Sequence, residues 1–323
     1  MARLIESVYG HEDIIDSLVQ LKHHDRWPHA FLFVGPPSVG KRKLALAFAQ
    51  ILICEQADLA CGVCGGCLRV AKQQSENLTV IEPDKSLAKP VIKVEAIRGL
   101  LDALSLSSLG GKRVILIDEA HTMNHQAANT LLKTLEEPFE NVYFFLIGQS
   151  VQQFLPTIRS RSQVVRFSSL PTPTLRRIKP GLPDWAYRGS RGQVDRLTQM
   201  TSNEGLEKRA EAFDFLQQFI EDTEFLNSPN WRSQAKDRSW AALTISSWLQ
   251  VIGDALIAKA QGPNGAQMVS DIQAAQLEKL APVESRKLLK LSEYLVQAEK
   301  DIAGYLDPVL IFEKMWVDYA RMG

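Results

Sequence analysis

The sequence lacks a net charge, because its 37 basic residues balance 37 acidic ones. Without an overall positive field, composition gives no reason to expect the whole surface to attract nucleic acid, so any DNA contact must be local. Long apolar runs are also missing: no stretch approaches the eighteen or more apolar residues of a membrane span, and no low-complexity tail is present. With 323 residues and 45% hydrophobic content, the chain can form two or three domains with cores of their own.

Cysteine is scarce, and its four occurrences, Cys54, Cys61, Cys64 and Cys67, lie within fourteen residues. Such clustering argues against scattered disulfides, and the amino terminus has no apolar signal core, so we expect a cytoplasmic protein. Thiolates two residues apart can bind one ion in a tight turn, and Cys54 can complete a tetrahedron, which predicts a structural zinc site. An iron–sulfur cluster is a weaker alternative because the ferredoxin pattern needs a further Cys followed by Pro. Four free thiols are the remaining alternative.

A magnesium-binding hydroxyl is missing from an otherwise complete phosphate-binding loop. Residues 35–42, GPPSVGKR, match G-x-x-x-x-G-K-[ST] except at Arg42. An apolar run precedes the loop and helical periodicity follows it, so Gly35 and Gly40 fall at a strand-to-helix turn, where backbone N–H groups and Lys41 would contact phosphates. A guanidinium only donates hydrogen bonds and cannot ligate a cation. We therefore expect ATP or ADP to bind weakly, without hydrolysis.

A second nucleotide-site segment follows at residues 113–121, RVILIDEAH. Its apolar run is typical of a parallel strand covered on both faces, and Asp118 and Glu119 stand at the carboxyl end, where such sheets bind ligands. In phosphate-loop enzymes the Asp positions magnesium. The Glu could polarise a water molecule.

The order of the elements predicts an α/β fold: a parallel sheet with helices on both faces, followed by an all-α carboxyl-terminal domain. We expect Asn124 to cap a helix that ends before Pro138. The expected boundaries are 1–167 for the nucleotide-binding-like domain with its inserted zinc module at 54–67, 168–202 for a reduced lid or linker, and 203–323 for the helical domain. Strands are predicted at 30–34, 78–81, 113–117, 142–147 and 164–167.

Residues 13–167 resemble the AAA+ module of bacterial clamp-loader subunits. The similarity lies in HAFLFVGPPSVGK, the four-cysteine insertion, KRVILIDEAHTMN, AANTLLKTLEEP and FLPTIRSRSQ, and LDPVLIFEKMW near the carboxyl terminus resembles the end of the family's collar domain. The resemblance is weaker over 168–290. It implies a hetero-oligomeric ring with clamp-loader motor subunits and a delta subunit, which acts with a sliding clamp on primed DNA and needs no membrane.

The resemblance also implies a role for Arg161. The family's Ser-Arg-Cys triplet is here Ser160-Arg161-Ser162, and its Arg projects into the ATP site of the neighbouring subunit as an arginine finger. Arg159 is the less favoured substitute. The position of the family's γ-phosphate sensor falls in residues 148–150, Gly-Gln-Ser, where the usual Asn or Thr is missing.

Three functions remain open at this point. Arg42 favours a largely non-catalytic ring subunit that supplies Arg161 in trans. The intact pair Asp118 and Glu119 keeps a working ATPase motor of the same assembly as an alternative. More remotely, an AAA+ ATPase of DNA repair would hydrolyse ATP without clamp-loader partners.

Overall fold

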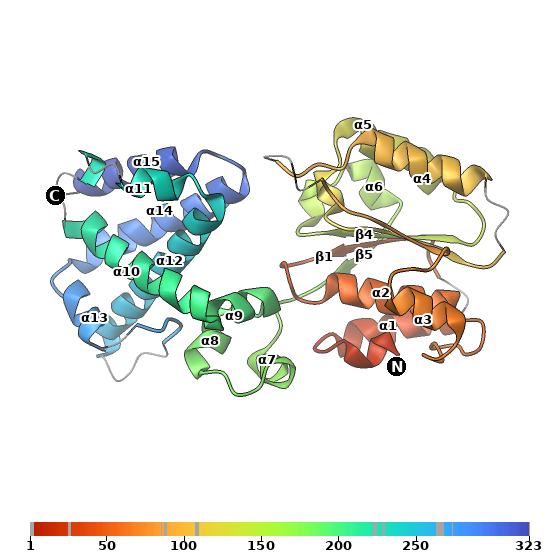
Figure 1. Ribbon diagram of the computed structural model, residues 1–323, viewed down its shortest axis with the longest axis horizontal. Helices are drawn as coiled ribbons and strands as arrows, with labels where there is room; N and C mark the ends of the chain where they lie inside the picture. Colours follow the sequence, from red (N-terminus) through yellow and green to blue (C-terminus); the bar gives the residue numbers. More distant parts are fainter. Residues whose placement is uncertain are drawn as a thin grey trace. The chain divides into compact units, whose positions relative to one another are not determined.

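The computed structural model describes residues 3–24, 27–84, 86, 89–106, 110–221, 225–227, 230–262, 268–272 and 274–322. The chain divides into two compact units, Met1–Thr174 and Leu175–Gly323. The first unit is an α/β domain and the second is helical (Figure 1). The expected fold class is therefore confirmed.

A five-stranded parallel sheet forms the centre of the first unit, in the order β2-β3-β4-β1-β5. Every residue of β1 is buried, as expected for a strand covered on both faces. Each predicted strand exists, although β4 continues one residue further and β5 begins and ends one residue earlier than expected. The strands are β1 (Ala30–Val34), β2 (Leu78–Ile81), β3 (Arg113–Ile117), β4 (Val142–Gly148) and β5 (Gln163–Arg166).

Helices cover both faces of this sheet (Figure 1). On one face lie α1 (Glu12–His23), α2 (Lys41–Ile53) and α3 (Gly65–Ala71), and on the other lie α4 (Val94–Leu106), α5 (His125–Glu136) and α6 (Pro156–Ser160). Alternate strand residues fill the two cores, since side chains of a strand point to opposite faces. Leu32 and Phe144 pack toward α4 and α5, whereas Phe31 and Phe145 stack on each other with ring centroids 5.4 Å apart.

The amino-terminal end of α5 has the predicted cap. Asn124 Oδ1 accepts a hydrogen bond from the backbone N–H of Ala127 at 2.7 Å. This bond satisfies one of the amides that the first turn of a helix leaves without a partner. The helix ends at Glu136, two residues before Pro138, so both expected boundaries are confirmed.

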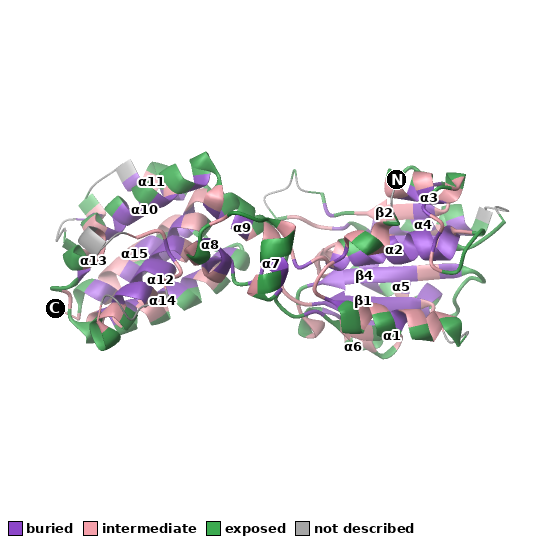
Figure 2. Ribbon diagram, turned by 90° about the horizontal axis from the view of Figure 1, so that it is seen from below, coloured by how far each residue is buried: buried purple, intermediate pink, exposed green. Residues whose placement is uncertain are grey.

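The second unit is built around α12 (Arg238–Gln261), which is largely buried among the neighbouring helices (Figure 2). Its Trp248 is fully buried in the hydrophobic core of this unit. By length and hydropathy α12 could cross a membrane, but 56% of its most apolar window is buried inside the unit, as in the core helix of a folded domain. The other helices of this unit are α8 (Asp184–Gly189), α9 (Val194–Thr201), α10 (Asn203–Glu221), α11 (Asn230–Ala235), α13 (Ala274–Leu280), α14 (Ser285–Ala303) and α15 (Pro308–Ala320), and the boundary between the two units falls within α7 (Thr172–Ile178).

The segment expected to be a reduced lid, 168–202, contains α7, α8 and α9. The side chain of Gln250 on α12 donates to the carbonyl of Gly189 at 2.9 Å, which connects α8 to the core helix of the second unit. The division of residues 168–323 into a lid and a collar stays a prediction.

Candidate nucleotide and metal sites

The glycine loop joins β1 to α2, as the sequence predicts. Gly35 has φ +150°, and a Cβ there would lie 2.3 Å from the carbonyl oxygen of Phe167, so only glycine fits. Gly40, with φ +105°, precedes the first turn of α2 in the left-handed region. Lys41 Nζ donates to the carbonyls of Gly35, at 2.7 Å, and Pro36. Burial lowers the pKa of Lys41 to about 8, and the nearby Asp118 carboxylate acts in the opposite direction.

Arg42 reaches across the same end of the sheet and binds three acceptors from different segments. Its Nη1 donates to Asp118 Oδ2 at 3.1 Å and forms an ion pair with Glu82, while Nη2 donates to Gln73 Oε1 at 2.9 Å. Glu82 follows β2 and Asp118 follows β3, and these strands are neighbours. The guanidinium therefore pairs with the carboxylates that would otherwise attract a divalent ion. A magnesium ion does not fit here, because the guanidinium occupies the carboxylate oxygens that would be its ligands.

The backbone after β3 is also arranged around Asp118. Its other oxygen, Oδ1, accepts the N–H of Glu119 at 2.9 Å, and Glu119 has φ +46°, a conformation uncommon for a residue with a Cβ. The structure thus brings Gly35, Lys41, Asp118 and Glu119 to one end of the sheet, as predicted. Nucleotide binding by these residues stays a prediction.

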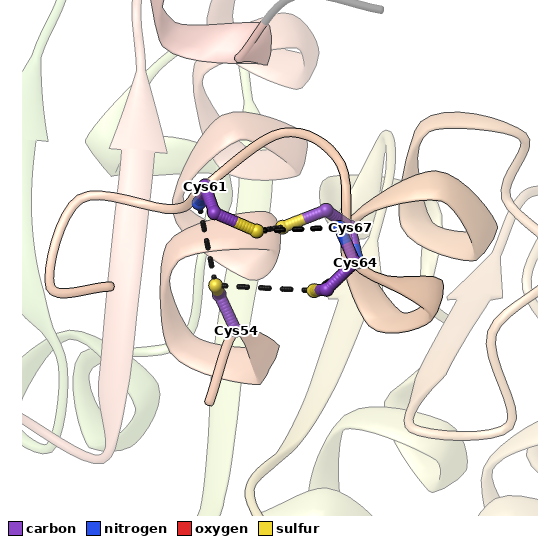
Figure 3. A group of neighbouring side chains, drawn as sticks. All are labelled: Cys54, Cys61, Cys64 and Cys67. Atoms are coloured by element: carbon purple, nitrogen blue, oxygen red, sulfur yellow. Dashed lines mark hydrogen bonds between the residues drawn. The ribbon is translucent and has the colours of Figure 1, made fainter. Parts of the chain in front are cut away.

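The four cysteine sulfurs lie together, each within 4.8 Å of the others (Figure 3). The Sγ atoms of Cys54 and Cys64 are 4.0 Å apart, and those of Cys61 and Cys67 are 3.9 Å apart. A tetrahedral zinc ion with four Zn–S bonds requires sulfur separations of about 3.8 Å. The cysteines are free rather than paired in disulfides. The arrangement therefore fits zinc.

Backbone amides support the sulfur cluster. The N–H groups of Cys61, Cys64 and Cys67 donate to the sulfurs of Cys54, Cys61 and Cys64 at 3.2–3.4 Å. Hydrogen bonds from the backbone of Val63 and Cys64 lower the pKa of Cys61 to about 6, whereas burial raises the pKa of Cys67 to about 12. Amide donors of this kind stabilise thiolates, the form in which cysteine binds metal.

Two helices, α2 and α3, position this cluster, and α2 begins within the phosphate loop. Cys54 directly follows α2, and Cys64 is the N-cap of α3. Gln50 of α2 is almost fully buried, and its Nε2 donates to the carbonyl of Cys67 at 3.1 Å. The cysteine module and the phosphate loop are thus placed by opposite ends of α2.

Arg161 lies at the carboxyl end of α6, away from the cysteine cluster in the sequence and on the other face of the sheet. Its Nη1 donates to the carbonyl of Thr157 and to Ser160 Oγ, both at 3.2 Å, and its Nη2 pairs with Glu136 Oε1 at 2.9 Å. The side chain remains 35% exposed. Arg159 differs, because its Nε is buried without a hydrogen-bond partner among the described residues.

Sequence reasoning missed the polar partners of both arginines. Gln73 and Glu82 bind Arg42, and Glu136 binds Arg161. Of these, Glu82 carries a signal that could have revealed it, because it follows a strand predicted to end beside Asp118.

Another missed residue is His121, whose buried Nδ1 has no partner in the described part of the chain and whose pKa is lowered by burial. It lines a pocket of about 110 Å³ between the start of α5 and α6.

Comparison with known families connects this geometry to a class of proteins. The family described as "DNA polymerase III, delta subunit" matches residues 10–171, which include the glycine loop, the cysteine cluster, Asp118 and Arg161. The chain belongs to this family. The matched residues all lie in the first unit of this delta-family chain.

Several curated proteins are similar to the same part of the chain. DNA polymerase III subunit delta' of Pseudomonas aeruginosa is 39% identical over 145 residues, 44% of each chain. Subunit tau of Escherichia coli is 39% identical over 157 residues, 48% of this chain and 24% of that protein, and subunit delta' of Escherichia coli is 32% identical over 152 residues, 46% and 45% of the two chains. The delta-family chain thus matches less than half the length of each relative.

A solved structure with wider coverage is a gamma subunit-related protein of DNA polymerase III from Thermotoga maritima. It is 18% identical, covers 94% of this chain and 98% of its own, and superposes with a TM-score of 0.48.

Proposed function

We propose that this chain is a delta'-like subunit of the DNA polymerase III clamp loader, which helps to load the sliding clamp onto primed DNA. It would sit in a hetero-oligomeric ring with motor subunits and a delta subunit, in the cytoplasm. Its own ATP site would be largely non-catalytic, and Arg161 would act as an arginine finger in a neighbouring site.

The observation that carries this proposal is the set of contacts that Arg42 makes. A phosphate-loop ATPase uses a hydroxyl and an Asp to hold magnesium, which neutralises charge on the transferred phosphoryl group. Here the hydroxyl is replaced, and the guanidinium pairs with Asp118 and Glu82. Gly35, Gly40 and Lys41 could still hold ATP or ADP weakly through its phosphates. Hydrolysis would lack both the metal ligand and free carboxylates.

We further propose that the four cysteines hold one structural zinc ion. Four thiolates at tetrahedral spacing leave no open coordination position, so the ion supplies local folding energy and no chemistry on a substrate.

A working motor subunit, similar to gamma or tau, is the second candidate. The retained pair Asp118 and Glu119, with Lys41 in place, supports it. The ion pair between Arg42 and Asp118 weighs against it, and so we rank it second. A DNA repair ATPase is more remote and predicts DNA-stimulated hydrolysis without clamp-loader partners.

The proposal is tested by Arg161→Ala in a reconstituted clamp loader. Since a finger contacts phosphoryl oxygens chiefly in the transition state, folding and ring assembly should be unchanged while clamp loading slows. An arginine finger contributes roughly 10³ to 10⁵ in rate at its own site, but other sites of the ring would keep their fingers, so the pre-steady-state loading rate is the appropriate measurement.

Arg159→Ala removes the same charge two residues away and is the matched control. Arg161→Lys should rescue poorly, because a point charge cannot reproduce the planar fork of the guanidinium. Loading at the wild-type rate by the Arg161→Ala complex would show that the finger assignment is wrong and that the chain is at most a structural brace.

A further inference from the structure

Glu136 is the one acidic partner of Arg161 within the described part of the chain. Its Oε1 lies 2.9 Å from Arg161 Nη2. The two residues come from different helices, since Glu136 is the last residue of α5 and Arg161 follows α6. Leu135, the residue before Glu136, and Ile158, three residues before Arg161, are both buried in the same core. Packing of α5 against α6 therefore fixes the backbone on both sides of the ion pair.

The position of Glu136 is electrostatically poor for its own helix. The carboxyl end of a helix carries a partial negative charge, so a carboxylate in the last turn is disfavoured there. Glu136 is 48% exposed, and Arg161 is the only cation in an ion pair with it among the described residues. Within the part of the chain that the structure describes, the ion pair of this carboxylate is thus with the proposed finger.

The contacts of Arg161 use only some of its donors. A guanidinium has five N–H groups. Nη1 donates to the carbonyl of Thr157 and to Ser160 Oγ, and Nη2 forms the ion pair with Glu136. The N–H groups of Nε and Nη2 have no hydrogen-bond acceptor among the described residues, so they can donate to oxygens of a ligand, and the side chain is 35% exposed. Held in this way, the guanidinium is restricted in orientation without being fully occupied.

We propose that Glu136 is a positioning residue that orients Arg161 for the phosphoryl group bound by a neighbouring subunit. This inference rests on the proposed finger role of Arg161. A long side chain loses conformational entropy when it is fixed in the orientation that contacts the phosphoryl group. If its rotamers are already restricted before the ligand arrives, part of this entropy cost is removed from the binding step. An exposed ion pair is also weak enough for the guanidinium to adjust its position when the phosphoryl oxygens arrive.

The test is Glu136→Gln in the reconstituted complex, with Glu137→Gln as the matched control. Glu137 is the next residue, exposed, and has the same charge. Because an exposed pair is weak, Glu136→Gln should lower the pre-steady-state clamp-loading rate by about twofold to fivefold. The KM for ATP and the assembly of the ring, measured by analytical ultracentrifugation, should not change. Glu137→Gln should load clamps at the wild-type rate.

A double-mutant cycle separates positioning from a general structural effect. In an Arg161→Ala background, Glu136→Gln should have no further effect, since the group that it orients is gone. Three results would each overturn the inference. Glu136→Gln could lower the loading rate equally in both backgrounds, it could weaken ring assembly, or it could load clamps at the wild-type rate while Arg161→Ala loads them slowly. If Arg161→Ala itself has no effect, the finger role fails first, and that result is distinguishable from failure of the positioning role alone.

Discussion

Position 42 determines what the phosphate loop can do. A Ser or Thr there would offer an oxygen to a metal ion, whereas Arg42 offers hydrogens to Asp118, Glu82 and Gln73. The Arg42 guanidinium thus takes the place of a metal ion beside the carboxylates at the ends of β2 and β3. This positive charge is attached to the protein and cannot exchange with the solution.

Replacement of this residue should make nucleotide binding depend on magnesium. In Arg42→Thr, a hydroxyl returns to the loop and the carboxylates of Asp118 and Glu82 lose their partner, so Mg²⁺ can bind with the nucleotide. We expect the affinity for ADP to rise about tenfold or more when Mg²⁺ is added to the variant, and to change little in the wild-type chain. Isothermal titration calorimetry with Mg²⁺ and with EDTA measures both.

Lys43→Thr is the control for this experiment, because Lys43 is the next residue of α2 and is exposed. It removes the same charge from the same turn without touching Asp118 or Glu82. A wild-type chain whose ADP affinity already depends strongly on Mg²⁺ would contradict our interpretation of Arg42.

The role of a single residue could be predicted from the sequence where its partners lie close to it in the chain. Gly35, Gly40 and Lys41 follow from a contiguous motif, and Asn124 follows from capping chemistry within four residues. Gln73 and Glu136 could not be predicted, since each meets its arginine only through the packing of separate helices. No periodicity in the sequence encodes such a contact.

Among the elements, the strands were the most predictable. A parallel strand buried on both faces must be apolar along its whole length, so β1 and β3 stand out in the sequence. The short helices between residues 172 and 201 were harder, because prolines and polar residues there resemble a linker. Tertiary packing in the second unit, including the bond from Gln250 to Gly189, supports these helices where local propensity does not.

The cysteine module should depend on its metal for local structure. Structural zinc sites have apparent binding energies of about 10–16 kcal/mol, which appear as folding energy of the segment that binds the ion. We expect one zinc per chain by atomic emission spectroscopy. A strong chelator should expose four titratable thiols and should raise hydrogen exchange across residues 54–67 while the sheet stays protected.

Amides of β1 provide the internal reference in this exchange experiment, since that strand is fully buried on the same unit. Protein that is purified without chelator and folded, yet contains no zinc or reacts at four thiols, would show that the site is not a zinc site.

For the whole molecule, the proposed function predicts almost no ATP hydrolysis by the isolated chain. With Arg42 on Asp118, charge developing on the transferred phosphoryl group would not be neutralised, even though Glu119 is retained. Steady-state phosphate release should stay at the background level, with and without DNA. The ring assembled with motor subunits should hydrolyse ATP.

Lys41→Ala distinguishes true turnover from a contaminating ATPase. If the wild-type chain turns over ATP steadily and Lys41→Ala abolishes that activity, the motor function replaces the one proposed above. DNA-stimulated turnover without any partner would instead favour the repair ATPase.

The shared helix α2 limits how this sequence can change over evolutionary time. The phosphate loop lies at its first residue, Lys41, and the first cysteine of the cluster, Cys54, follows its last residue, Ile53. Each residue added to a helix turns everything beyond it by about 100° and moves it by about 1.5 Å. A single insertion or deletion in α2 would therefore swing Cys54 away from the other three sulfurs, and even a four-residue insertion, about one turn, would displace it by roughly 6 Å. Lineages that keep both sites can substitute residues in this helix but cannot alter its length.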